Sequence, residues 1–78
     1  MDKNELWDIA ILNGYIARNA NGNTRYTDAG FKLAKDFFKT DSAKRAGINI
    51  HDPVDVQVVI LLIVEELVAL GHVEADNG

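Results

Sequence analysis

The chain has 78 residues, contains no cysteine and carries a formal net charge of −4. A chain of this length forms one domain with a small core, and the absence of cysteine excludes disulfides and thiolate metal sites. The acidic opening, MDKNELWDIAIL, lacks the basic-then-apolar order of a secretory signal, and the longest apolar run, residues 58–64, is too short to span a bilayer. We therefore expect a single helical domain over residues 1–78, located in the cytoplasm and without a membrane partner.

Charge is distributed unevenly along the sequence. Residues 18–45 contain seven Lys or Arg against three Asp, whereas residues 46–78 contain six Asp or Glu and no Lys or Arg. The basic middle leaves nucleic-acid binding open, and the acidic last third favours a partner with a basic surface. The simpler explanation of both groups is that they solvate helix faces.

The first predicted helix covers residues 3–19, with Asn4 or Asp2 as its N-cap. Its apolar residues fall on two separate faces of a helical wheel. One stripe consists of Leu6, Ile9, Leu12 and Ile16. The other, spaced i, i+4, i+8, consists of Trp7, Ile11 and Tyr15. Either a compact bundle encloses both stripes, or the aromatic one is a contact surface, because Trp and Tyr are enriched in interface hot spots.

The second predicted helix follows a turn at NANGNTR, residues 19–25. It covers TDAGFKLAKDFFK, with Thr27 as its N-cap. One side of this helix is apolar, and the other side carries Lys32, Lys35, Asp36 and Lys39. A short further turn through SAKRA is expected to stop at Gly47.

The third predicted helix is DPVDVQVVILLIVEELVALG, residues 52–71. Asp52 is suited to the N-cap, Pro53 to the first helical position and Gly71 to the position after the end. The many β-branched residues favour a strand instead, but caps at both ends and the continuation EELVAL favour a helix.

This third helix is apolar around most of its circumference. The residues that interrupt its apolar surface are Asp55, Gln57, Glu65 and Glu66. A helix of this kind is buried on several sides, and two short helices leave part of it uncovered. The predicted fold class is therefore all-α, a compact three- to four-helix bundle with a short extended tail at GHVEA. The uncovered part predicts contact with another chain, including a homodimer through the third helix as one alternative.

Catalytic and metal-binding patterns are weak. His51 and His72 flank the third helix and would lie about 30 Å apart along it, too far to share a metal ion. The adjacent carboxylates of Glu65 and Glu66 point about 100° apart on a helix and do not converge on a substrate. The glycines form neither a dinucleotide fingerprint nor a P-loop. We expect no enzyme activity, no cofactor and no metal site.

Two segments resemble parts of winged-helix regulators. RYTDAGFKLAKDF, residues 25–37, resembles the end of a wing, where a strand runs into a Thr-x-x-Gly helix start. ELVALGHVEAD, residues 66–76, is similar to the junction between a recognition helix and the first wing strand. The two segments occur in reverse order here, so one continuous winged-helix domain does not fit the chain.

The leading functional hypothesis is a small acidic protein that acts by binding another protein. This would be an inhibitor or adaptor of the general type of phage-encoded anti-CRISPR proteins or bacterial immunity proteins. The predicted partner-binding residues are Trp7, Ile11, Tyr15, Glu65 and Glu66. The first alternative is a small dimeric DNA-binding regulator in which Lys32, Lys35 and Lys39 contact the phosphate backbone of the DNA. A purely structural homo-oligomer is the second alternative.

Overall fold

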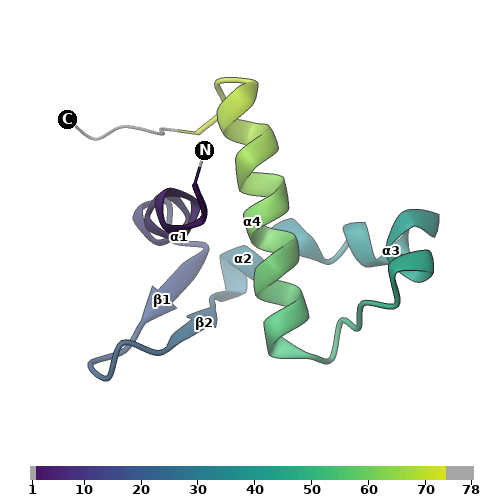
Figure 1. The fold of residues 1–78 in the computed structure, drawn as a ribbon, viewed down its shortest axis with the longest axis horizontal. Helices are drawn as coiled ribbons and strands as arrows, with labels where there is room; N and C mark the ends of the chain where they lie inside the picture. Colours follow the sequence, from purple (N-terminus) through teal and green to yellow (C-terminus); the bar gives the residue numbers. More distant parts are fainter. Residues whose placement is uncertain (1, 74–78) are drawn as a thin grey trace.

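A computed structural model describes residues 2–73 of the chain. The helix α4 runs through the centre of the molecule, with α1 and a hairpin on one side and α3 on the other (Figure 1). In chain order the elements are α1 (Lys3–Leu12), β1 (Ile16–Arg18), β2 (Thr24–Tyr26), α2 (Asp28–Ala34), the 3-10 helix η1 (Phe37–Lys39), α3 (Asp41–Ala46) and α4 (Pro53–Ala69).

The all-α prediction is wrong, because a small antiparallel sheet follows the first helix. Strands β1 and β2 form a hairpin in which Ile16 pairs with Tyr26 and Arg18 pairs with Thr24. The first helix ends at Leu12 instead of continuing to residue 19. Its end is fixed by Gly14, whose φ of 79° lies in the left-handed region that residues with a Cβ rarely adopt.

The turn predicted over residues 19–25 is confirmed as the hairpin loop over residues 19–23, whereas Thr24 and Arg25 already belong to β2. The Asn19 side-chain oxygen accepts hydrogen bonds from the backbone N–H groups of Asn21 (2.9 Å) and Asn23 (3.0 Å). Strand β2 then runs directly into α2 at Thr27, as the resemblance of this segment to the end of a wing implied. The extended tail expected at GHVEA is not found in residues 71–73, which form a turn and a bend, and residues 74 and 75 lie outside the described residues.

The predicted N-caps are confirmed at three helices. The Asp2 carboxylate accepts from the N–H groups of Asn4 (2.7 Å) and Glu5, and the Asp52 carboxylate accepts from the N–H of Val54 (2.9 Å). Thr27 caps α2. The second predicted helix, however, is interrupted after Ala34 and resumes as η1.

Thr27 also joins the two ends of the hairpin. Its hydroxyl donates a 2.6 Å hydrogen bond to the carbonyl of Gly14 and accepts one from the N–H of Gly30 (3.0 Å). Its own N–H donates to the carbonyl of Tyr15 (3.1 Å). One side chain therefore caps α2 and holds the turn after α1 against it.

We expect Thr27→Ala to lower the free energy of unfolding by about 1–2 kcal/mol, because it removes both the cap and the bond to Gly14. Thr27→Ser keeps the hydroxyl and should recover most of that loss. Urea denaturation followed by circular dichroism measures both changes. Equal destabilisation by Ser and Ala would show that the hydroxyl contributes little.

The core is built around α4, which packs against α1, α2 and β2. This central position confirms that the apolar helix is buried on several sides. Its fully buried residues are Val56, Val59, Ile60 and Val64. They are joined in one cluster by Leu6, Ile9 and Ala10 of α1, Ile16 of β1 and Ala34 of α2.

Candidate protein interface

One strip of α4 remains outside the core. Val54, Val58 and Leu62 are 65%, 44% and 54% exposed. Their spacing of i, i+4, i+8 places them on one face of the helix. Single exposed apolar residues are ordinary, but three in a row along one helix form a surface that favours contact with another molecule.

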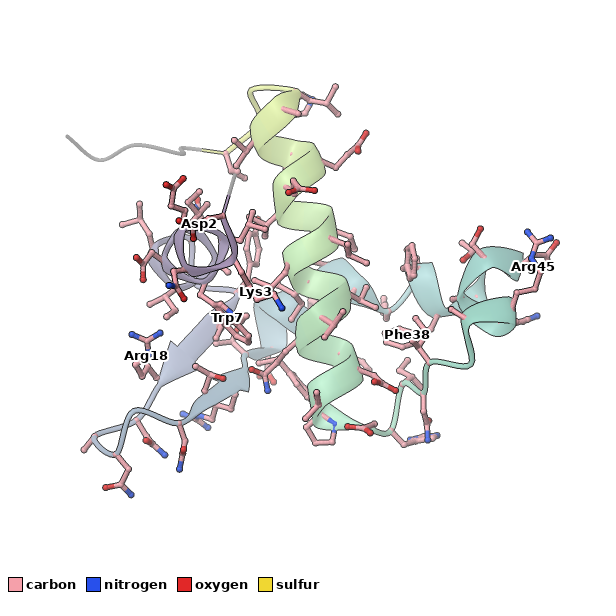
Figure 2. The ribbon with its side chains drawn as sticks, viewed as in Figure 1. Asp2, Lys3, Trp7, Arg18, Phe38 and Arg45 are labelled. Atoms are coloured by element: carbon pink, nitrogen blue, oxygen red, sulfur yellow. The ribbon has the colours of Figure 1, made fainter. Side chains whose placement is uncertain are left out.

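Trp7 of α1 extends this strip sideways. A hollow bordered by α1, the hairpin and α4 is lined by Trp7, Asn23, Thr24, Val54, Gln57 and Val58. A second hollow is lined by Lys3, Leu6, Trp7, Val58, Leu61, Leu62 and Glu65. Both hollows include Trp7 and Val58, so they form one continuous surface. We call the surface formed by Trp7, Val54, Val58 and Leu62 the α1–α4 face. Figure 2 shows the side chains of Lys3 and Trp7 lying between α1 and α4.

The apolar surface continues beyond Leu62 toward the end of α4. A third hollow there is lined by Phe37, Leu62, Ile63, Glu65, Glu66 and Leu67. Leu62 and Glu65 belong to both this hollow and the preceding one. The carboxylates predicted as partner-binding groups therefore lie at the rim of the apolar surface.

The predicted aromatic stripe is divided by the end of α1. Trp7 lies on the α1–α4 face, but Tyr15 follows the helix and is held by hydrogen bonds of its backbone N–H to Ala10 (2.9 Å) and of its carbonyl to Thr27. Ile11 and Tyr15 are half-buried and pack against the core cluster. Neither lines the three hollows along α4. The structure thus brings Trp7 and Glu65 to one hollow, whereas Glu66 lines the separate hollow that includes Phe37. It does not place Tyr15 on the same helical stripe.

Sequence reasoning overlooked two features of this region. It treated Val54, Val58 and Leu62 only as part of an all-round apolar helix, without predicting which side would stay uncovered. It also noted Gln57 as an isolated polar residue without finding its partner. Gln57 is only 7% exposed, and its Oε1 accepts a 2.7 Å hydrogen bond from the Thr24 hydroxyl. An isolated polar residue within an apolar helix was the available indication of such a bond.

The lysines of the DNA-binding alternative do not share a continuous helix. Lys32 lies in α2, Lys35 is the C-cap of that helix and Lys39 lies in η1. All three are exposed. Lys39 forms an ion pair of 3.6 Å with Asp36, and no other ion pair occurs within residues 2–73.

Groups that could support catalysis or bind a metal are dispersed. Within the described part of the chain, no three His, Asp or Glu residues lie together as metal ligands. His51 and His72 are exposed near opposite ends of α4. None of the helices between residues 2 and 73 combines the length and the apolar character needed to cross a membrane.

Comparisons with protein families, with characterised proteins and with solved structures gave no match to this chain.

Proposed function

We propose that the protein acts without catalysis, by binding another protein through the α1–α4 face. Its role would be that of an inhibitor or adaptor, of the general type of phage-encoded anti-CRISPR proteins or bacterial immunity proteins. We place it in the cytoplasm, because a chain without cysteine suits a reducing compartment. The observation that carries the proposal is the exposed strip Val54, Val58 and Leu62 beside Trp7.

This strip has the composition of an interface centre. Tryptophan is the residue type most enriched among hot spots, and it contributes most where surrounding apolar groups exclude water. Trp7 is half-buried and already supported by the core, so binding would immobilise little additional side chain. Val58 and Leu62 flank it on α4. A partner covering these residues would remove apolar area from water at small entropic cost.

We expect Leu62→Gln to abolish capture of the partner while leaving the fold intact. Leu62 is 54% exposed, so the change should alter the free energy of unfolding by no more than about 0.5 kcal/mol. The measurement is affinity capture from nuclease-treated lysate with tagged wild-type and variant proteins. Leu70→Gln is the matched control, because Leu70 is 60% exposed but does not line the three hollows.

A protein captured by the wild type and by Leu70→Gln, and lost with Leu62→Gln, supports the proposal. Capture that is unaffected by Leu62→Gln overturns the role assigned to this face. Circular dichroism of each variant ensures that loss of capture is not loss of fold.

One observation favours a DNA-binding regulator as the second candidate. The hairpin carries Arg18 and Arg25 and runs into α2 at Thr27, beyond which Lys32 is exposed. These cations would contact phosphates and provide an affinity that falls with salt. The nuclease step separates the two candidates, because proteins retained through DNA disappear from the capture after digestion.

A further inference from the structure

We infer that the α1–α4 face binds an amphipathic helix of another protein, one that carries Lys or Arg along the flank next to α4. This inference rests on the proposed function and specifies the chemistry of the partner. It depends on the shape of the surface and on the charges at its rim.

The surface has the dimensions of a helix-binding groove. The two hollows that contain Trp7 follow α4 from Val54 to Glu65, a distance of about 16 Å at 1.5 Å per residue. Trp7 and Val58 lie where the first two hollows meet. Helices that bind in grooves present apolar anchors at i, i+3 or i+4, and i+7, which matches a surface of this length.

The rim of the surface is acidic on the side of α4. Glu65 borders two of the hollows and Glu66 borders one, and both side chains are exposed. Neither forms an ion pair within residues 2–73. The chain from residue 46 to its end contains no Lys or Arg that could neutralise them. Lys3, on the side of α1, is the one cation that lines these hollows.

This asymmetric rim favours an occupant with cations on one flank. Lys or Arg next to α4 would meet Glu65 and Glu66, and such pairs increase both the association rate and the specificity. A cation on the opposite flank would be repelled by Lys3. The rim therefore selects the orientation of the bound helix as well as its charge.

A second copy of this chain is a poorer occupant. Two α4 strips packed in parallel would place Glu65 against the same residue of the other copy. An antiparallel arrangement would bring Glu65 toward the acidic start of α4, which carries Asp52 and Asp55. Neither arrangement supplies a Lys or Arg from the opposing α4, and opposed like charges are unfavourable.

Synthetic helical peptides test this inference directly. The probe has Leu at helical spacing, Lys along one flank of the Leu stripe and uncharged polar residues at the remaining positions. It is compared with a peptide that has Glu in place of Lys, and with a scrambled Lys–Leu peptide of the same composition. Trp7 is the only tryptophan in the chain, so its fluorescence reports occupation of the face. We expect the Lys peptide to bind and the Glu peptide to bind at least about tenfold more weakly.

Two charge variants distinguish attraction of the peptide by the rim carboxylates from attraction by the net charge of the protein. Glu65→Gln/Glu66→Gln should weaken binding of the Lys peptide by about 3- to 20-fold, as expected for two rim charges. Glu5→Gln/Asp8→Asn removes the same net charge from exposed positions of α1 that do not line the hollows, and it should weaken binding by less than about twofold.

Several results would overturn the inference. Equal binding of the Glu and Lys peptides would show that the rim does not select a basic helix. Equal binding of the Lys peptide and its scrambled form, or equal effects of the two charge variants, would show the same. A fluorescence shift that depends on protein concentration alone, with a dimer in sedimentation, would assign the face to a second copy. The proposed function fails separately, through the capture experiment with Leu62→Gln.

Discussion

Gly30→Ala is expected to lower the free energy of unfolding by about 3 kcal/mol, the largest effect among the substitutions considered. A Cβ at this position would lie 2.9 Å from Cδ1 of Ile60 and 3.0 Å from the carbonyl carbon of Tyr15, and closer still to the Tyr15 carbonyl oxygen. Ile60 can adjust its side chain, but Tyr15 presents backbone. That same Tyr15 carbonyl accepts the N–H of Thr27, so moving it would also disturb the start of α2.

The sign of this effect is informative, because alanine ordinarily stabilises a helix relative to glycine by about 1 kcal/mol. Gly22→Ala is the matched control. Gly22 lies in the hairpin loop with φ at 85° and open space around its Cα, so alanine there should cost only about 1 kcal/mol of backbone strain. Urea denaturation of both variants gives the comparison. If Gly30→Ala were no more destabilising than Gly22→Ala, the close approach of α2 to Tyr15 would be wrong.

Gln57→Leu is expected to destabilise the protein by about 1–3 kcal/mol, although it makes α4 more apolar. The Thr24 hydroxyl donates to Oε1 of Gln57, and the Gln57 amide lies 3.5 Å from the carbonyl of Thr24. Removing the amide leaves the half-buried hydroxyl without its partner. Thr24→Val should destabilise for the complementary reason, because it leaves the buried Gln57 incompletely bonded.

The double variant Thr24→Val/Gln57→Leu tests whether this bond is the cause. Replacing both partners with apolar groups removes the unsatisfied atoms, so its free energy of unfolding should lie close to that of the wild type. Chemical denaturation of all four proteins provides the interaction energy. Simple addition of the two single losses would contradict coupling between β2 and α4 through these side chains.

The features that the sequence predicted well are local ones. The caps Asp2, Thr27 and Asp52 act on N–H groups two or three residues away, so their spacing alone identifies them. The hairpin was harder to predict, because each strand has only three residues. Ile16 continued the apolar helical spacing of α1, and that periodicity masked the turn at Gly14.

The candidate interface was predictable only in part. Trp7 could be selected by residue type, since large aromatic side chains are favoured at contacts. The strip Val54, Val58 and Leu62 could not, because an all-round apolar sequence does not indicate which side its neighbours cover. That side depends on the length of α1, which ends at Leu12, and on the break that separates α2 from η1. These are tertiary properties.

The central position of α4 has a consequence for synthesis of the protein. Helix α4 is made after α1, the hairpin, α2 and α3, yet it contributes most of the largest fully buried side chains. Until it emerges from the ribosome, the apolar residues of α1 and α2 lack the surface they pack against. We therefore expect the nascent chain to remain accessible to chaperones and proteases until α4 has been made.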